Sequence, residues 1–205
     1  MNAYLALDFN LFSYIDPREA LLSDLIAEFL SPEGKHGQGD VFLHLFGRQI
    51  GIEEWPPNKR PTVRREVPIT YPPHSYGFLD ILVDVGSFGI GIENKPWAGE
   101  QPEQLGRYRA HLEHQYSGRY ALVYLSGPGT PPTTLPAEVQ ERLASVGQFR
   151  TLSYKSGLTK WLRACEKECK AEKIRWLLRD FESFLTDAFD LEGDEGRSED
   201  EPGRN

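Results

Sequence analysis

The chain has 205 residues, of which 39% are hydrophobic and 26% charged, and its mean hydropathy is -0.50. This composition is typical of a protein that buries a core without metals or disulfides, and no apolar run approaches the roughly 20 residues of a membrane span. The formal net charge is -8, but residues 190–205 hold seven acidic and two basic residues, so the rest of the chain is weakly acidic and a polyanionic partner is not excluded.

The length, composition and charge distribution predict one folded domain followed by an acidic tail. We expect residues 1–189 to form a single domain and residues 190–205 to form an acidic, disordered tail. The amino terminus lacks the basic stretch and the small-residue cleavage site of a secretory signal, which predicts a cytoplasmic protein. Cys165 and Cys169 cannot complete a four-ligand metal site by themselves, so we assign them no role.

Two helices are expected first. Residues 16–30 begin with a possible Asp16 cap and Pro17 at the first helical position, and apolar residues then recur at helical spacing. Glycine and proline make residues 31–40 a loop. Residues 41–51 predict a second helix, which ends before the prolines of "WPPNKRP".

Three strands follow in the middle of the chain. Residues 62–71, 78–85 and 89–95 read "TVRREVPITY", "FLDILVDV" and "GIGIENK", and they are rich in Ile, Val and Leu. Loop residues separate the first two strands, and a glycine-flanked turn separates the second from the third. The three runs therefore predict neighbouring strands of one sheet.

The second and third strands predict a tight hairpin, because only two residues separate Gly86 from Gly89. If these glycines face each other, Asp80 lies opposite Lys95. Opposed residues point to the same face and side chains alternate along each strand, so Glu93 shares that face. We expect the side chains of Asp80, Glu93 and Lys95 to converge.

The second half of the chain alternates helices and strands. The apolar pattern predicts a helix at 102–116, a strand at 119–126, a short helix, a strand at 149–154, and two helices at 157–170 and 173–189. The complete order predicts an α/β fold in which helices flank a mixed central β-sheet.

Two carboxylates and an ammonium on an apolar sheet are costly unless opposite charges or a metal compensate them. Mg²⁺ is typically held by one or two carboxylates, with water and substrate phosphate oxygens completing its coordination. The trio of Asp80, Glu93 and Lys95 therefore indicates a metal-dependent phosphodiesterase. The alternative is a salt-bridged sheet face that performs no chemistry.

The motifs resemble those of the PD-(D/E)XK nuclease superfamily. The aspartate of "LD", then "IENK" after a hairpin, then "AGEQPEQLGRY" occur in the order of that superfamily. More narrowly, they resemble its bacterial group with IENK and a helix of the form QPxQLxRY. The segment "REALLSDLIAEFLSPEGKHGQGD" is similar to the amino-terminal segment of that group, and Leu79 stands where the motif's name has proline.

The resemblance implies a restriction-endonuclease-like core and a role for each motif residue. Asp80 and Glu93 would bind Mg²⁺, with Mn²⁺ as a substitute, and Lys95 would help to activate the attacking water. Glu19 would be a further acidic residue near the metal. Gln104 would orient the lysine or a phosphate oxygen.

Gln101, Gln104 and Tyr108 fall at i, i+3 and i+7, so we expect them on one stripe of a helix, addressing the substrate together. A different reading makes Gln101 a helix-entry residue and Tyr108 part of the core.

The function expected from the resemblance is a Mg²⁺-dependent nuclease that hydrolyses nucleic acid, with DNA as the first expectation, and leaves a 5′-phosphate. Residues 155–179 hold eight basic and three acidic residues, and "NKRPTVRRE" is a second basic cluster. Either could follow phosphates or be a solvated face. A homodimer is one way to cut both strands of a duplex. The alternative function is an inactive binding or regulatory module with the same fold.

Overall fold

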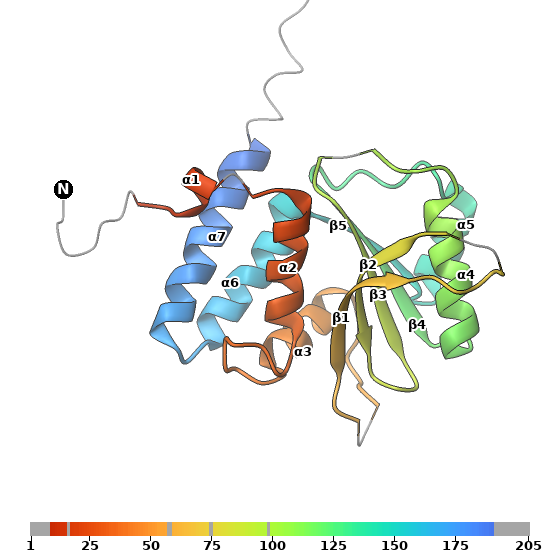
Figure 1. Cartoon of the computed structure of the whole chain (residues 1–205), viewed down its shortest axis with the longest axis horizontal. Coiled ribbons are helices and arrows are strands. Elements are labelled where there is room, and N and C mark those ends of the chain that lie inside the picture. Colours follow the sequence, from red (N-terminus) through yellow and green to blue (C-terminus); the bar gives the residue numbers. More distant parts are fainter. Residues whose placement is uncertain (1–8, 16, 57–58, 74–75, 98, 191–205) are drawn as a thin grey trace, which may run out of the picture.

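The computed structural model describes residues 9–15, 17–56, 59–73, 76–97 and 99–190, and it shows one β-sheet with helices on both faces (Figure 1). Within those ranges, no helix is both long enough and apolar enough to cross a membrane. The elements in chain order are α1 (Phe12–Ile15), α2 (Glu19–Leu30), α3 (Val41–Gln49), β1 (Thr62–Pro68), β2 (Phe78–Asp84), β3 (Gly89–Lys95), α4 (Gln104–Tyr116), β4 (Tyr120–Ser126), α5 (Ala137–Ser145), β5 (Phe149–Ser153), the π-helix η1 (Tyr154–Leu158), α6 (Thr159–Glu168) and α7 (Glu172–Asp190).

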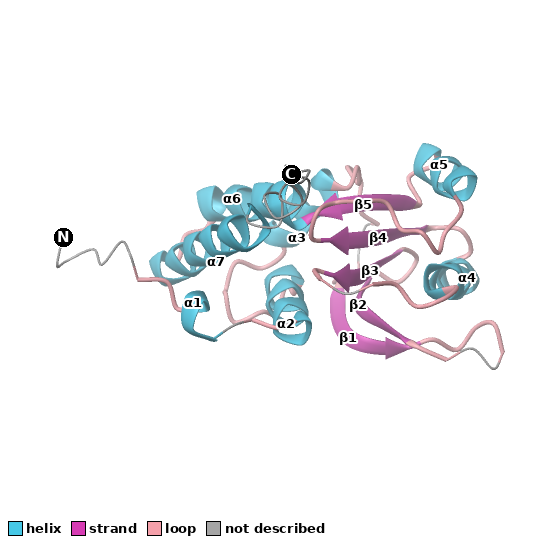
Figure 2. Ribbon diagram, turned by 90° about the horizontal axis from the view of Figure 1, so that it is seen from above, coloured by secondary structure: helices cyan, strands magenta, loops and turns pink. Residues whose placement is uncertain are grey.

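The sheet has five strands in the order β1-β2-β3-β4-β5. Strands β1, β2 and β3 pair antiparallel, whereas β4 and β5 run parallel to β3. Parallel neighbours need a crossover, which α4 and α5 supply on one face (Figure 2). The predicted α/β fold, with a mixed sheet flanked by helices, is confirmed.

Each face of the sheet has its own apolar core. Strand β4 is buried at every position, and its side chains alternate between the two cores. Val123 and Leu125 pack in the core shared with α2, α3, α6 and α7. Leu122 and Tyr124 pack in the core shared with α4 and α5. A central strand that is apolar on both faces is what a sheet covered on both sides requires.

Several element boundaries differ from the prediction. The first predicted helix begins at Glu19 as α2, and the expected cap at Asp16 lies outside the described residues. Helix α4 begins at Gln104 and not at Pro102, because Glu103 adopts a left-handed conformation (φ 57°). The predicted tail lies outside the described residues after Asp190, the last residue of α7.

The hairpin register was predicted wrongly by two residues. The structure pairs Leu82 with Gly91 and Asp84 with Gly89, which puts Gly86 and Ser87 at the turn. Gly86 has a positive φ of 77°, which a two-residue hairpin loop requires of its first residue and which glycine tolerates. Because the shift is an even number of residues, every side chain keeps its face of the sheet.

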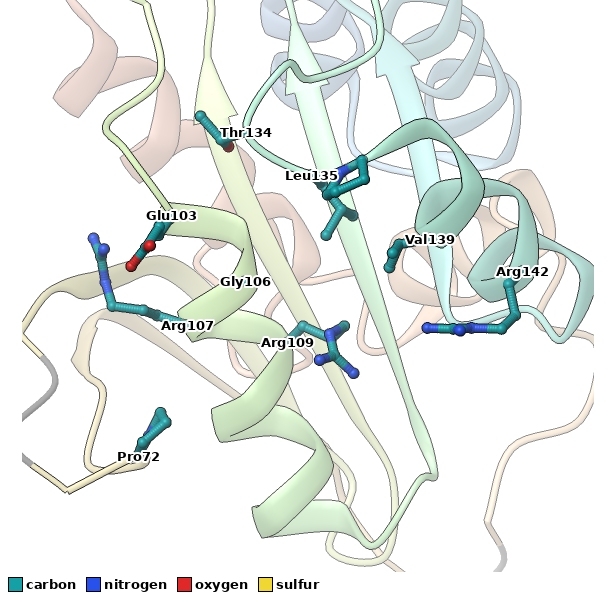
Figure 3. A pocket seen from close by; sticks show the side chains of 10 residues that line it. Pro72, Glu103, Gly106, Arg107, Arg109, Thr134, Leu135, Val139 and Arg142 are labelled. Atoms are coloured by element: carbon teal, nitrogen blue, oxygen red, sulfur yellow. The ribbon is translucent and has the colours of Figure 1, made fainter.

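Helices α4 and α5 and the loop before α5 line an open pocket of about 340 Å³, which we call the α4–α5 cavity (Figure 3). It lies on the face of the sheet that these helices cover, and Gly106 of α4 and Val139 of α5 line it.

Candidate active site

Asp80 lies where the pairing of β2 with both neighbours is interrupted. The β1–β2 ladder omits Glu66, which has a positive φ of 49°, and the backbone carbonyl of Asp80 accepts a hydrogen bond from Arg65 Nε at 2.9 Å. On the other side, the β2–β3 ladder stops at Ile81, and Asp80 Oδ2 accepts the backbone N–H of Asn94 at 2.7 Å. The side-chain and backbone bonds at this interruption together hold the carboxylate between β2 and β3.

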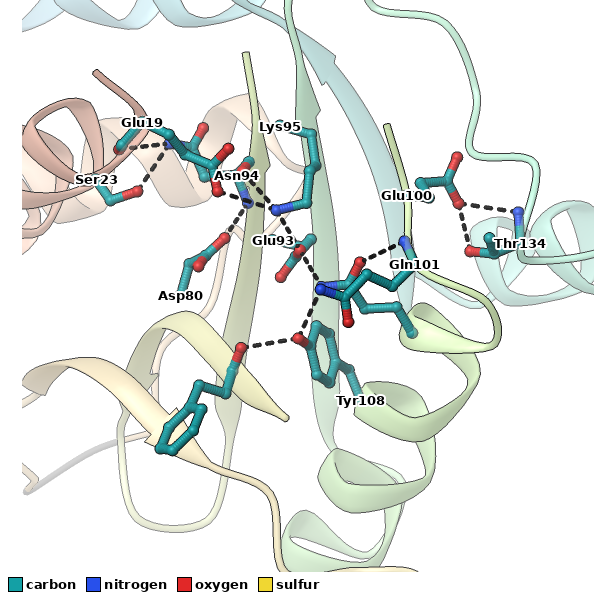
Figure 4. Close-up of polar contacts among 12 residues, drawn as sticks. Glu19, Ser23, Asp80, Glu93, Asn94, Lys95, Glu100, Gln101, Tyr108 and Thr134 are labelled. Carbon is teal, nitrogen blue, oxygen red and sulfur yellow. Dashed lines mark hydrogen bonds and ion pairs between the residues drawn. The ribbon is translucent and has the colours of Figure 1, made fainter. Parts of the chain in front are cut away.

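Glu93 and Lys95 occupy the end of β3, which is buried along its whole length. Lys95 Nζ lies 2.9 Å from Glu93 Oε1, and the two side chains are 9% and 1% exposed. The carboxylate of Asp80 is close enough to influence the titration of both groups. The structure therefore brings the three predicted residues together (Figure 4).

Helix α2 completes the surroundings of the lysine. Glu19, the first residue of α2, places Oε1 3.0 Å from Lys95 Nζ. A third contact comes from the backbone carbonyl of Asn94, which lies 3.3 Å from the same ammonium. Glu19 thus contacts the lysine, and within the described residues no group of three or more His, Cys, Asp or Glu side chains is arranged to hold a metal ion.

Asn94, between the two charged residues of β3, is fully buried and bonded on every side. Its Nδ2 donates to Ser23 Oγ of α2 at 2.8 Å, and its Oδ1 accepts from Tyr154 Oη of η1 at 2.7 Å. The side chain of Asn94 therefore fixes α2 and η1 against β3, while its backbone contacts Asp80 and Lys95.

A chain of hydrogen bonds approaches Glu93 from α4. Gln104 Nε2 lies 2.7 Å from Glu93 Oε1 and 2.9 Å from Tyr108 Oη, and the tyrosine donates to the Phe78 carbonyl at 2.8 Å. Gln104 and Tyr108 are 6% and 2% exposed. Gln101 precedes the helix, so the predicted stripe does not include it, and its backbone N–H donates to Gln104 Oε1 at 3.2 Å.

Burial dominates the titration of this cluster. Burial and the charge of Asp80 raise the pKa of Glu93 to about 8, although Lys95 opposes the shift. Burial also raises the pKa of Asp80, against the Asn94 N–H and Lys95. For Lys95, burial alone lowers the pKa, but the carboxylates of Glu93 and Asp80 outweigh it and the net pKa is raised. Two buried carboxylates face one ammonium, so the cluster favours additional positive charge.

The donor set fits a divalent metal with few protein ligands. Glu93 Oε2 is buried and accepts no hydrogen bond from the described residues, so it has a free ligand position. Asp80 supplies a second carboxylate beside it. Mg²⁺ is commonly bound by one or two carboxylates together with water and substrate phosphates, so two acids are sufficient.

Sequence reasoning missed four residues that shape this site. Asn94 lies inside the quoted "IENK", but nothing in the sequence distinguishes a bonding amide from an ordinary residue at that position. Arg65 was noted only as part of a basic cluster. The residues that the prediction missed are Ser23, Arg65, Asn94 and Tyr154.

Comparison with known proteins adds one match. A family model described as the PD-(D/E)XK nuclease superfamily matches residues 9–183. No curated protein and no solved structure matches the chain.

Proposed function

The chain belongs to the PD-(D/E)XK nuclease superfamily, and on that premise we propose that it is a Mg²⁺-dependent nuclease that hydrolyses DNA. Asp80 and Glu93 would hold the metal and Lys95 would act on the attacking water. Mn²⁺ would substitute for Mg²⁺, and the product would carry a 5′-phosphate.

The observation that carries the proposal is the free oxygen of Glu93. A buried carboxylate oxygen without a hydrogen bond is costly, and a metal ion bound to it would remove that cost. Asp80 lies beside it, and the two acids share a single ammonium. When bound, a divalent ion supplies charge that polarises the scissile phosphate and lowers the pKa of water.

The residues around the metal would position the attacking water and the metal ligands. Lys95 keeps its proton because its pKa is raised, so its ammonium can hold the water by hydrogen bonds and offset negative charge on the phosphate. Glu19, 3.0 Å from Lys95 Nζ, would hold that ammonium in its orientation through an ion pair. Gln104 would fix the rotamer of Glu93 so that Oε2 stays available for the metal.

The test is a panel of labelled substrates. Single-stranded DNA, duplex DNA and RNA are incubated with Mg²⁺, Mn²⁺ or EDTA and with wild-type protein, Asp80→Ala or Lys95→Ala. We expect wild-type protein to cut DNA with Mg²⁺ or Mn²⁺ and not in EDTA, and each variant to lose roughly 100-fold or more in rate. Arg48→Ala, on an exposed position of α3, is the control for purification artefacts.

Three outcomes would change the proposal. Full Mg²⁺-dependent cleavage by Lys95→Ala would remove the lysine from the chemistry. Cleavage of RNA alone would replace DNA as the substrate. Binding of nucleic acid without cleavage, under every metal condition, would favour an inactive binding module.

A further inference from the structure

The α4–α5 cavity is lined by three arginines and one glutamate, so the groups around it carry a net positive charge. Figure 3 shows the side chains of Arg109, on α4, and Arg142, on α5, directed toward one another from the two helices. Arg107, two residues before Arg109 on α4, lines the same cavity. Two guanidinium groups that share a cavity repel one another unless an anion lies between them.

The chain provides little to neutralise these cations. Among the described residues, none of the three arginines forms an ion pair with a carboxylate. The ion pairs there involve other basic side chains. The Nε atoms of Arg107 and Arg109 are buried and have no acceptor among the described residues. An anion in the cavity would balance guanidinium charges that no ion pair within the described residues balances.

The α5 side of the cavity carries apolar residues as well as Arg142. Leu135 and Val139 line it together with Pro136, and Gly106 leaves open space where a Cβ would stand. A volume of about 340 Å³ is within the range of small-molecule sites. Guanidinium groups next to apolar side chains match the two parts of a nucleotide, its phosphate and its sugar or base.

We propose that the α4–α5 cavity binds the phosphate group of a nucleotide through Arg109 and Arg142. The nucleotide could belong to the strand held at the active site or be a free nucleotide, and both present the same phosphate chemistry. The assignment to the strand rests on the proposed nuclease function, whereas the phosphate site itself does not.

The cavity is linked to the active site through α4 and through Glu100, and for this reason we assign it first to the strand. Helix α4 presents Gln104 to Glu93 on one side and Arg109 to the cavity on another. Arg109 follows Gln104 by five residues, so the two side chains leave the helix about 7.5 Å apart along its axis and roughly 140° apart around it. Glu100, just before the helix, also bonds the backbone N–H groups of Thr133 and Thr134 at 2.7 and 2.9 Å, which fixes the rim of the cavity to the approach to the active site.

The experiment compares Arg109→Gln/Arg142→Gln with a control that loses the same charge, Arg48→Gln/Arg119→Gln. Both control arginines are exposed and lie outside the cavity. Urea unfolding first establishes that each variant is folded. Binding is then measured in EDTA, so that cleavage plays no part.

Two probes separate the two sources of phosphate. The first is a labelled single-stranded 20-mer, whose affinity is measured as a function of salt. The second is inorganic phosphate or dAMP, whose binding is followed through the Nε–H nuclear magnetic resonance signal of Arg109. Arg142→Glu, an exposed single change, repeats both measurements if the double variant is unstable.

We expect phosphate and dAMP to shift the Arg109 signal. The cavity variant should bind the 20-mer about 10-fold more weakly and reduce the salt slope by about 1, while the control keeps the slope of wild-type protein. A shift with dAMP but an unchanged 20-mer slope would support the phosphate site and assign it to a free nucleotide. No shift together with an unchanged slope would overturn the proposal.

These outcomes are independent of the nuclease assay. A wild-type protein that binds phosphate in the cavity but cuts no substrate would contradict the proposed function alone. A wild-type protein that cuts DNA and whose cavity variant behaves as the control does would contradict this inference alone.

Discussion

Glu93 is buried with one carboxylate oxygen bonded to Lys95 and Gln104 and the other without a partner among the described residues. This arrangement serves metal binding better than it serves stability. In the absence of metal, the carboxylate is more easily protonated than an exposed glutamate, since burial and the charge of Asp80 both oppose ionisation. The proton and the metal therefore compete for the same side chain.

The first prediction concerns pH. The pKa of Glu93 is about 8 in the folded state and near its ordinary value of 4.5 in the unfolded state. Between these values the folded state binds more protons, so the free energy of unfolding falls as pH rises from 5 to 8. We expect the metal-free protein to lose on the order of 3 kcal/mol over this range in urea unfolding.

Glu93→Gln is the matched control for the pH prediction, because its amide keeps the shape of the side chain and does not titrate. The slope between pH 5 and 8 should flatten in this variant. An equal slope in both proteins would assign the pH dependence to other groups.

The second prediction distinguishes the role of Gln104 from that of Gln101. Gln104→Met removes the N–H donor to Glu93, so the glutamate loses an orienting contact. We expect a 10- to 100-fold lower cleavage rate and a higher Mg²⁺ requirement, as for other residues that orient metal ligands. Gln101→Ala keeps its backbone bond to Gln104 and serves as the control. Equal losses in both variants would instead support a substrate role for Gln101.

At the residue scale, sequence reasoning finds charged groups better than the groups that hold them. Charges on apolar strands are conspicuous, so Asp80, Glu93 and Lys95 could be chosen from their pattern alone. Asn94 is equally buried, but its bonds depend on α2 and η1, which are distant in the sequence. Contacts of this kind cannot be found from local periodicity.

At the scale of elements, the side chain of Asn94 connects α2, β3 and η1. The third prediction is that Asn94→Ala lowers the free energy of unfolding by roughly 3 kcal/mol, because it leaves the hydroxyls of Ser23 and Tyr154 without their partner. Urea unfolding measures this loss. Tyr154→Phe removes one of the two bonds and should cost about half as much. A neutral Asn94→Ala would mean that water or a neighbouring group replaces the amide.

The fourth prediction compares two glycines. In β3, a Cβ at Gly89 would overlap the ring of Tyr116, and overpacking of this kind typically costs 1–3 kcal/mol. In α4, a Cβ at Gly106 meets nothing within 4 Å, and alanine is the better helix former by about 1 kcal/mol. Gly89→Ala should therefore lower the urea midpoint and Gly106→Ala should raise it. The same sign in both would contradict this packing analysis.

Element types could be predicted from the sequence because periodicity is local, but some boundaries depend on single residues. The hairpin illustrates the limit. Gly86 and Gly89 both permit a turn, and the structure places the turn at Gly86 and Ser87. Asp84 Oδ1 accepts the N–H of Gly86 at 2.6 Å, which stabilises this choice. The convergence of the charged residues was still predictable, because an even shift preserves the faces.

At the scale of the whole molecule, the candidate site draws on both layers of helices. Glu19 comes from α2 on one face of the sheet and Gln104 from α4 on the other, and they meet at the end of β3. The sequence could predict the order of these elements and the mixed sheet. It could not predict that helices from opposite faces reach the same strand, because that depends on how the layers pack.

The last prediction follows from the small number of acids in the site. Two carboxylates leave most of a Mg²⁺ coordination sphere to water and to the substrate, so the metal should bind weakly alone and more tightly with nucleic acid. If the dissociation constant is about 1 mM, 10 mM Mg²⁺ stabilises the protein by about 1.4 kcal/mol, or roughly 3–6 °C in Tm. This shift should be larger at pH 8 than at pH 6, since Glu93 must lose its proton to bind.

Thermal unfolding of Lys95→Ala with Mg²⁺, with and without a single-stranded 20-mer, tests this coupling without cleavage. The Tm increase from both ligands together should exceed the sum of the separate increases, because each ligand completes the site of the other. The double variant Asp80→Ala/Lys95→Ala, which lacks one carboxylate, should show no Mg²⁺ shift with or without the 20-mer. A Mg²⁺ shift that persists in the double variant would place the metal elsewhere on the molecule, and strictly additive shifts would mean that metal and nucleic acid do not share a site.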